Sequence, residues 1–450
     1  MKVTKFGGSS LASAGQIRKV FEIVSADRSR RFVVVSAPGK RSSDDIKVTD
    51  LLIDYFTSYK LDKDFTAIQS QLIGRFQEIV TELDLAGILP EITNRIYGLA
   101  KLPLDNGFTY DSFLATGEDL SARIVAEFFN KNGLTARYVS PREAGLFVSN
   151  RPSHAELLPE AYAEIEKLIP LAEKEILVIP GFFGMTRSGE VCTFSRGGSD
   201  ITGSIIAAAV KAELYENFTD VDGIFSANPN TVENPVIIEE VTYREMRELS
   251  FAGFSVLHEE SLIPAARAGV PMVLRNTNNL SAKGTRIVPQ WTIDMPVVGI
   301  ASSSGFVIVK INKYLLYRDL SFGRKFFEIL ENLGIQFEAI TTGIDDISIL
   351  VREIYLSVQV EKSLTERVLE SLQPDDFSIL RGLSVVTAVS EEIRQQTHIT
   401  SRATTALANE KIKIETLMQG ASEVTLLFIV LQEDEKKTVR TLYQEFFEKL

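Results

Sequence analysis

Cysteine and histidine are almost missing from this chain of 450 residues. The one cysteine, Cys192, cannot form a disulfide within the chain, and such a composition is typical of a reducing, cytoplasmic compartment. The three histidines, His154, His258 and His398, lie far apart in the sequence. They give none of the short ligand spacings of a zinc site, so we expect no metal held by the protein alone.

Long hydrophobic runs are also missing. The longest apolar stretches, such as SIIAAAV at 204–210, are much shorter than the ~20 residues of a membrane-spanning helix. The N-terminus has no basic segment followed by an apolar run, so we expect no signal peptide. Acidic residues outnumber basic ones by 60 to 48, and the formal net charge of −12 disfavours binding to nucleic acid or anionic membranes.

Short apolar runs that alternate with helical patterns fill the first two thirds of the chain. Runs such as VTKF at 3–6 and RFVVVSA at 31–37 are typical of buried parallel strands. Segments such as AGQIRKVFEIVSA at 14–26 and DITGSIIAAAVKAEL at 200–214 have the spacing of amphipathic helices. This alternation predicts an α/β domain over residues 1–295, with a mostly parallel sheet covered on both faces.

The last part of the chain contains an internal repeat. Residues 329–351 align without a gap on residues 406–428. Each copy has the pattern of a helix end, a strand, a glycine turn and a second strand. We therefore predict two small α+β modules, at 296–380 and 381–450; the alternative is a chance similarity of amphipathic elements. The matched pairs are Leu330 with Leu407, Ile335 with Ile412, Glu338 with Glu415 and Gly343 with Gly420.

Two glycine loops follow predicted strands. KFGGSS at 5–10 precedes a helix expected to begin near Ala12, and FSRGGSD at 194–200 precedes a second helix. Glycines let backbone N–H groups approach an anion, a helix start adds a positive dipole end, and each loop carries a cation. Neither loop matches a P-loop, and a plain strand–helix turn is the alternative for the first. Together they predict a ligand pair with several negative charges, such as nucleotide phosphates and an anionic acceptor.

Two acidic segments add to this pattern. NFTDVDGIFSANP at 217–229 is either an Asx-turn loop or a nucleotide loop. ATGEDLSAR at 115–123 places Glu118 where we expect a helix to open, so this acid either serves the helix dipole or binds a ligand.

These segments, in this order and together with VVSAPG, VTDLL and GFFG, resemble the aspartate kinases of the amino-acid kinase family. The resemblance implies a three-layer α/β/α kinase domain, and the repeat resembles the paired, ferredoxin-like ACT regulatory domains of that family. It implies phosphorylation of the β-carboxylate of L-aspartate by ATP with Mg²⁺, the first step of lysine, threonine and methionine biosynthesis. Since no region beyond residue 450 could hold a homoserine dehydrogenase, we expect the monofunctional type.

The resemblance also implies roles for individual residues. Lys5 and Asp200 would be the catalytic pair, and no general base is needed because a carboxylate with a pKa of about 4 is already ionised. The aspartate-binding residues would be Thr49, Glu118, Arg196, Gly197, Gly198 and Ser199. The ATP-binding residues would be Lys5, Gly7, Gly8, Ser9, Thr219, Asp220, Phe225 and Asn230.

Some positions depart from the family pattern near the nucleotide. Family members often carry tyrosine at the position of Phe225, arginine at that of Asn230 and lysine at that of Ser255. Glu259 and Glu260 add negative charge beside Ser255. We therefore expect ATP to be bound more weakly than is usual for the family.

The first repeat offers an effector site. Its loop and helix start suit the carboxylate of a free amino acid, and two acids could pair with an ammonium group. The resemblance implies feedback inhibition by L-lysine, with threonine as the alternative, and a homodimer or dimer of dimers. Otherwise these acids are ordinary surface groups and the repeats only hold the dimer. The expected effector residues are Asp319, Ser321, Phe322, Gly323, Phe337 and Glu338.

Two other functions stay open at this point. One is another amino-acid kinase that acts on glutamate, acetylglutamate, carbamate or a nucleotide. The other is an inactive amino-acid sensor, which would be expected to have lost Lys5 or Asp200, although both are present.

Overall fold

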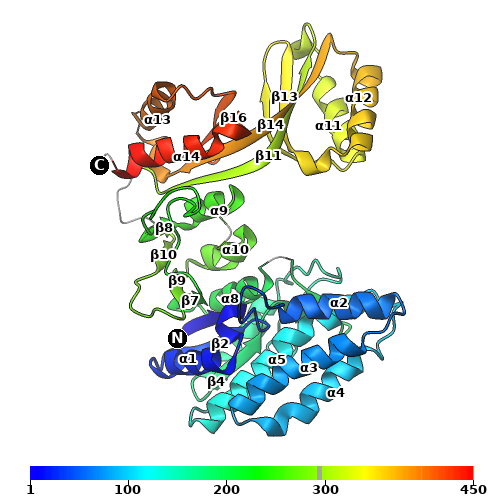
Figure 1. Ribbon diagram of the computed structural model, residues 1–450, viewed down its shortest axis with the longest axis vertical. Coiled ribbons are helices and arrows are strands. Elements are labelled where there is room, and N and C mark those ends of the chain that lie inside the picture. Colours follow the sequence, from blue (N-terminus) through cyan, green and yellow to red (C-terminus); the bar gives the residue numbers. More distant parts are fainter. Residues whose placement is uncertain (196, 255, 291–295, 397, 449–450) are drawn as a thin grey trace. The chain divides into compact units, whose positions relative to one another are not determined.

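The computed structural model describes residues 1–450 except 196, 255, 291–295, 397 and 449–450 (Figure 1). The chain forms two compact units. The first comprises Met1–Ile224, Ile237–Phe251 and Ser255–Ile293, and the second Phe225–Val236, Ala252–Phe254 and Asp294–Leu450. The segment Phe225–Val236 thus belongs to the second unit although both of its neighbours in sequence belong to the first.

The first unit is built on an eight-stranded sheet with the order β3-β4-β2-β1-β7-β9-β10-β8. The six strands from β3 to β9 in this order are parallel, and β10 runs antiparallel to β9. The mostly parallel sheet predicted from the sequence is therefore confirmed. The strands are β1 (Lys2–Phe6), β2 (Arg30–Val35), β3 (Ala136–Tyr138), β4 (Ile176–Pro180), β7 (Leu214–Thr219), β8 (Glu240–Thr242), β9 (Met272–Asn276) and β10 (Thr285–Val288).

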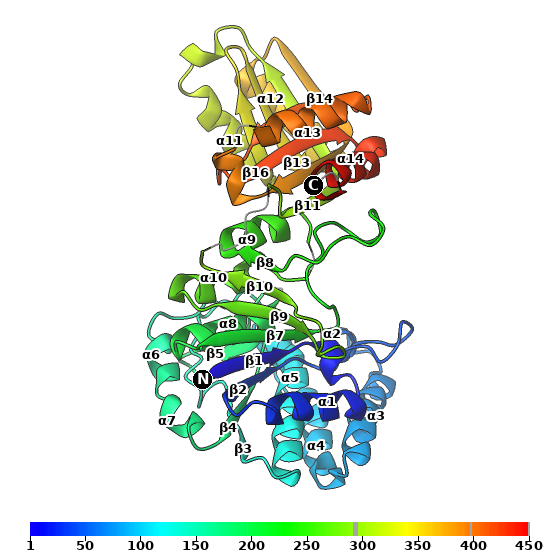
Figure 2. The same ribbon diagram turned by 90° about the vertical axis from the view of Figure 1, so that its left-hand side faces the viewer.

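Helices cover both faces of this sheet. Alternate strand residues such as Phe6, Val33 and Val35 pack into one core with the helices of one face, as the two-residue period of a strand requires. These helices are α1 (Ala14–Ser25), α2 (Val48–Lys60), α3 (Thr66–Glu82), α4 (Leu89–Leu99) and α5 (Thr109–Lys131). Figure 2 shows α6 (Ala161–Glu166) and α7 (Ile169–Ala172) on the other side. The remaining elements of this unit are α8 (Gly198–Ala209), α9 (Tyr243–Phe251), α10 (Glu259–Ala268) and the hairpin of β5 (Phe183–Met185) and β6 (Val191–Thr193).

The register of the central strands brings three strand ends together. Phe6 at the end of β1 pairs with Val35 at the end of β2 and with Phe218 near the end of β7. Since the strands are parallel, the loops that follow them begin at one edge of the sheet.

A buried ion pair ties the central strands together. Glu216 of β7 is 1% exposed, and both of its oxygens accept hydrogen bonds from Arg30 of β2, at 2.6 Å from Nε and 2.9 Å from Nη2. Arg275 of β9 contributes a third contact at 3.3 Å. The bidentate geometry satisfies a carboxylate that would otherwise be costly to bury.

The second unit is built on a six-stranded antiparallel sheet with the order β12-β13-β11-β14-β16-β15. The helix–strand–strand run of α11, β12 and β13 recurs as α13, β15 and β16, so the predicted repeat corresponds to two α+β modules. The strands are β11 (Gly299–Asn312), β12 (Phe337–Thr342), β13 (Asp346–Arg352), β14 (Asp376–Val389), β15 (Thr416–Gln419) and β16 (Thr425–Leu431). The helices are α11 (Phe322–Asn332), α12 (Val358–Leu372), α13 (His398–Asn409) and α14 (Glu435–Tyr443).

Strands β11 and β14 are shared by the two modules. Val307 and Val309 of β11 lie in the core with α11 and α12, whereas Ile300 of the same strand lies in the core with α13 and α14. The β11–β14 register shifts on both sides of Phe306. Gly305 and Gly382 lie at these irregularities with φ of +80° and +70°, values that favour glycine. Two glycine bulges therefore mark the change from one module to the other.

We predict that Gly305→Ala destabilises the second unit. No atom lies within 4 Å of an added Cβ, so the cost is backbone strain alone, about 1–2 kcal/mol in the free energy of unfolding. Gly323→Ala is the matched control, because this glycine lies in α11 without a positive φ and also faces open space. Urea unfolding of both variants checks this, and a Gly305→Ala protein as stable as the wild type would contradict it.

Candidate active site

The KFGGSS segment forms a tight turn at the carboxyl end of β1. Lys5 is the penultimate residue of the strand and is 7% exposed. The Gly7 N–H donates to the carbonyl of Phe218 at 3.0 Å, and a 3₁₀ turn runs over Gly8–Leu11. Helix α1 begins at Ala14 rather than near Ala12, because Ser13 caps it by accepting a hydrogen bond from the Gln16 N–H.

The second glycine loop leads directly into α8. Gly197 has a φ of +73° and precedes the first helical residue, Gly198. A Cβ on Gly198 would lie 2.6 Å from Cδ2 of Phe182, so only glycine fits there. Asp200 lies in the first turn of α8. Arg196, which the sequence placed at the substrate, lies outside the described residues.

Lys5 and Asp200 connect the two loops. Lys5 Nζ lies 2.7 Å from Asp200 Oδ1, and Asn217 Nδ2 of β7 donates to the same oxygen at 2.7 Å. The Tyr215 hydroxyl donates to the Asp200 carbonyl at 3.1 Å. Asn217 was missed in the sequence, although its place at the start of NFTDVDG in a predicted strand is a usable signal. This network fixes the Asp200 carboxylate beside the ammonium group of Lys5.

Glu118 does not open a helix, contrary to the expectation from the sequence. It lies in the middle of α5, which begins at Thr109 and passes the site at Gly117. A Cβ on Gly117 would lie 2.7 Å from the Cβ of Ala37, so glycine is needed for the helix to pack here. The helix dipole therefore does not account for this acid.

The Glu118 carboxyl group is buried and incompletely satisfied. The residue is 5% exposed, and Oε2 has no hydrogen-bond partner among the described residues. Burial raises its pKa to about 8, although the Ala37 backbone and the charge of Lys5 act in the opposite direction. An orphaned buried oxygen of this kind suits a ligand group that carries a donor.

A cavity of about 590 Å³ lies among these groups. Two glycine loops, a buried acid and a Lys–Asp pair at the ends of parallel strands can bind and orient a polyanion next to a second small anion. The cavity brings together ten of the residues singled out in the sequence: Lys5, Gly8, Ser9, Thr49, Glu118, Gly197, Gly198, Ser199, Asp200 and Asp220.

Other expected residues do not line this cavity. Gly7 lies behind Lys5, with 3.5 Å between an added Cβ and Nζ, and Thr219 ends β7 beside Asp220. Phe225 and Asn230 belong to the second unit. Ser255 lies outside the described residues. Glu260 accepts a hydrogen bond from Ser195 at 2.9 Å, so this unusual acid does lie next to the second glycine loop.

Several lining residues were not singled out. They come from the segment after β2, from Phe182 and from Ser195; those of the segment are Ser36, Ala37, Pro38, Gly39, Lys40 and Lys47. The VVSAPG and GFFG motifs were available signals for part of this set. Phe182 has a φ of +77°, a strained conformation for an aromatic residue that sequence patterns do not reveal.

The expected effector residues lie on the first module of the second unit. Asp319 accepts hydrogen bonds from Ser321 N and Oγ at 3.0 and 2.8 Å, which lower the pKa of this carboxyl group. Glu338 pairs with Arg352 at 2.7 Å. The Phe322 side chain is buried in the module core, and Phe337 is exposed and stacks on Phe327. Gly323 faces open space.

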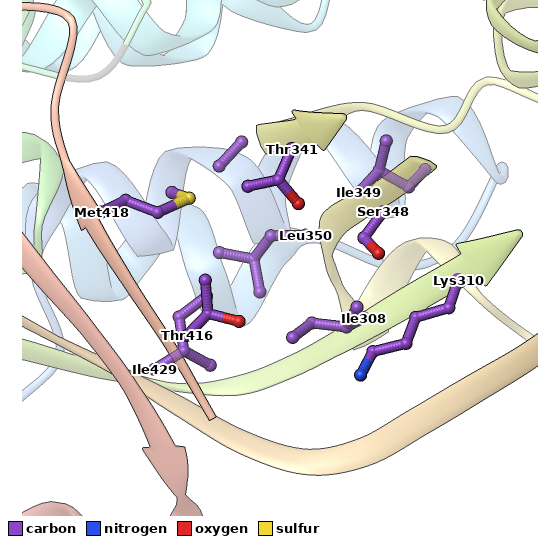
Figure 3. A pocket seen from close by; sticks show the side chains of 10 residues that line it. Ile308, Lys310, Thr341, Ser348, Ile349, Leu350, Thr416, Met418 and Ile429 are labelled. Carbon is purple, nitrogen blue, oxygen red and sulfur yellow. The ribbon is translucent and has the colours of Figure 1, made fainter. Parts of the chain in front are cut away.

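A separate small cavity of about 100 Å³ lies over the strands of the second unit. Thr416, Met418 and Ile429 face Ser348, Ile349 and Lys310 across it (Figure 3). Its lining contains no carboxylate and none of the expected effector residues. It is therefore a poor match for the ammonium group of an amino acid.

Two further features are absent from the described part of the chain. No helix in it is long and apolar enough to cross a membrane. No group of three or more metal-ligating side chains gathers within it.

Known proteins resemble this chain over its whole length. Residues 1–276 match the amino acid kinase family and residues 386–446 match the ACT domain. Aspartokinase 3 of Bacillus subtilis is 47% identical over 451 residues, which cover 99% of each chain. The crystal structure of Clostridium acetobutylicum aspartate kinase has a TM-score of 0.87 at 35% identity and covers 99% of this chain and 100% of that one.

A more distant structure shows likeness of fold alone. E. coli aspartokinase III, solved with aspartate and ADP, has a TM-score of 0.75 at 22% identity and covers 99% of this chain and 100% of that one. The family is shown by the match over residues 1–276 and by the relatives at 47% and 35% identity. The chain therefore belongs to the amino acid kinase family, as an aspartate kinase with C-terminal ACT modules.

Proposed function

We propose that the cavity between the two glycine loops is where the γ-phosphoryl group of ATP passes to the β-carboxylate of L-aspartate. The observation that carries this proposal is the Lys5–Asp200 contact of 2.7 Å in the same cavity as the buried Glu118. A cation between two glycine loops suits phosphates, and an unsatisfied buried carboxylate suits an ammonium group.

The nucleotide side of the cavity is formed by the KFGGSS turn. Backbone N–H groups of Gly8 and Ser9 would hold phosphate oxygens, with Gly7 shaping the turn and Lys5 supplying charge. Asp200 and Asp220 are carboxylates in the cavity that could face a Mg²⁺ ion carried by the nucleotide. Such an ion would neutralise charge on the phosphates. Thr219, which ends β7 beside Asp220, would line the rest of the nucleotide site.

The acceptor side is formed around Glu118. Its unpaired oxygen would accept a hydrogen bond from the α-ammonium group of aspartate, and Arg196 would bind the α-carboxylate. Thr49 in the first turn of α2 and Ser199 in the first turn of α8 would orient the substrate, with Gly197 and Gly198 leaving room for it. The β-carboxylate is already ionised and attacks without a general base. Catalysis then consists of positioning and charge stabilisation, which are the tasks of Lys5 and Asp200.

We further propose feedback inhibition by L-lysine at the first ACT module, with threonine as the alternative effector. E. coli aspartokinase III has been solved with lysine and aspartate. In this chain the Glu338–Arg352 pair and the carboxyl group of Asp319 lie on the same module as the start of α11. An effector ammonium would compete with Arg352 for Glu338. The effector would act by binding one conformational state more tightly than another.

The ACT modules would also join chains into a dimer or a dimer of dimers. Strands β12 and β15 are the edges of the six-stranded sheet, and an edge strand can pair with another chain. Phe337 and Ile340 on β12 and Leu417 on β15 are exposed.

We also propose a division into three domains, 1–295, 296–380 and 381–450, in which the β11 residues before Gly305 belong to the core of the last module. We further propose a cytoplasmic location.

Lys5→Ala tests the proposed transfer directly. Removing one charged stabiliser of developing negative charge commonly lowers kcat by ~10²–10³-fold, and we expect that loss here. A coupled ADP-release assay with L-aspartate measures it. Lys2→Ala is the matched control, because Lys2 lies on the same strand but pairs with Asp27 away from the cavity. A Lys5→Ala enzyme that keeps its fold and a near-normal kcat would refute the assignment.

Glu118 gives a pH prediction. Its pKa in the free enzyme is raised to about 8, so the carboxyl group is mostly protonated below that pH and becomes a partner for an ammonium group only on ionisation. We expect kcat/KM for aspartate to rise by up to ~tenfold per pH unit below pH 8 and then level off, since kcat/KM reports the free enzyme. Glu118→Gln should have a lower and flatter profile. An unchanged slope in this variant would show that Glu118 is not the titrating group.

Titration of activity with L-lysine and L-threonine, separately, tests the regulatory proposal. We expect inhibition by lysine, with the half-inhibiting concentration raised at least ~tenfold in Glu338→Ala, as expected for a lost charged contact. Glu331→Ala, which removes an exposed acid of α11, is the control. Inhibition by threonine alone, or lysine inhibition that is equal in both variants, would contradict this site.

A further inference from the structure

The segment between β2 and α2 places two lysines at the active-site cavity. Lys40 and Lys47 both line it, and both are exposed. Within the described part of the chain, the Lys40 ammonium group donates one hydrogen bond, to the Ser43 carbonyl at 3.3 Å. Among the described residues, neither lysine is paired with a carboxylate.

This segment is docked on the phosphate-binding turn. The Gly39 N–H donates to the Gly8 carbonyl at 2.8 Å, and a Cβ on Gly39 would lie 2.6 Å from the Gly8 carbonyl carbon. The Val48 N–H donates to the Pro38 carbonyl at 3.2 Å, which closes the segment into a loop. Lys40 is therefore next to the KFGGSS turn, and Lys47 is two residues before Thr49.

Two arginines hold the loop in this shape. Arg75 is 5% exposed, donates to the Gly39 carbonyl at 2.8 Å and forms an ion pair with Asp45. Arg41 donates to Asp45 from Nε at 2.9 Å and also pairs with Glu78. These contacts hold the pKa of Asp45 well below its usual range. Arg41 and Arg75 are thus paired with acidic side chains, whereas Lys40 and Lys47 line the cavity without such a partner among the described residues.

The charges of the cavity explain why such lysines are needed. Its described acids are Glu118, Asp200 and Asp220, and the Lys5 charge is already offset by Asp200 at 2.7 Å. Both substrates of the proposed reaction are anions. Bringing them together requires positive charge that is not already paired inside the site.

We propose that Lys40 and Lys47 are substrate-contacting residues of the kinase. Lys40, next to Gly39 and Gly8, neutralises the phosphates of the donor. Lys47, two residues before Thr49, stabilises the β-carboxylate of aspartate and the phosphoryl group that this carboxylate receives. Asp45 is a positioning residue that holds the loop through Arg41 and Arg75. The inference rests on the proposed function, because it assigns these lysines to the two substrates of that reaction.

Steady-state kinetics of alanine variants tests this assignment. A lost charge-assisted contact commonly lowers binding ~10–100-fold. We expect Lys40→Ala to raise KM for ATP by ~10-fold or more with a smaller change in kcat. We expect Lys47→Ala to lower kcat/KM for aspartate ~10–100-fold, with partial rescue in Lys47→Arg. Asp45→Asn should raise both KM values, because it releases the loop that carries both lysines.

Lys60→Ala is the matched control, since it removes an exposed lysine at the far end of α2. If the wild type is active and the Lys40→Ala/Lys47→Ala double variant has the same kcat and KM values as this control, the inference is wrong but the proposed function stands. A wild-type enzyme that releases no ADP with aspartate would overturn the proposed function and the inference with it. Since both lysines are exposed, we expect the thermal midpoints of their variants to match that of the wild type.

Discussion

The contact between Lys5 and Asp200 depends on the parallel pairing of β1 with β7. Lys5 pairs in register with Asn217, and Asn217 holds the same carboxylate oxygen that Lys5 contacts. A shift of one residue in this register would turn Lys5 to the opposite face of the sheet. The buried Arg30–Glu216 pair joins β2 to β7 on either side of β1. The placement of Lys5 beside Asp200 and Asn217 therefore depends on strand register.

Close packing around the cavity leaves little choice of residue at several positions. Gly39 against Gly8, Gly198 against Phe182 and Gly117 against Ala37 all leave less than 3 Å for an added Cβ. Each glycine lets a different element approach the cavity: the loop after β2, helix α8 and helix α5. The same close approach removes water from Glu118, which is why its carboxyl group is hard to ionise without a ligand. The need for glycine at these positions and the raised pKa of Glu118 thus have the same cause, which is the close packing around the cavity.

Much of the fold could be predicted from the sequence because its signals are local. Alternating apolar runs predicted the parallel sheet, and a gapless repeat predicted two α+β modules. The start of α5 was missed because Glu118 follows a glycine, and glycine is common at helix ends. In the structure this glycine lies inside the helix and allows it to pack against Ala37. Lys40 and Lys47 were missed because the loop that carries them is held by the ion pair between Arg75 and Asp45, which lie far apart in the sequence. The place of Phe225–Val236 in the second unit depends on contacts such as the Ile300 N–H to the Ser226 carbonyl, which no local pattern contains.

The strands shared by the two ACT modules constrain how the chain can fold during synthesis. Gly299 of β11 pairs with Val389 of β14, and Val389 pairs in turn with Thr425 of β16. The first half of β11 leaves the ribosome long before the strands that complete its sheet, and pairing between such distant segments is slow. The apolar face around Ile300 stays uncovered until α13 and α14 have been made. Neither module can be cut out without breaking a strand of the other, so the six-stranded sheet forms only when both modules are present.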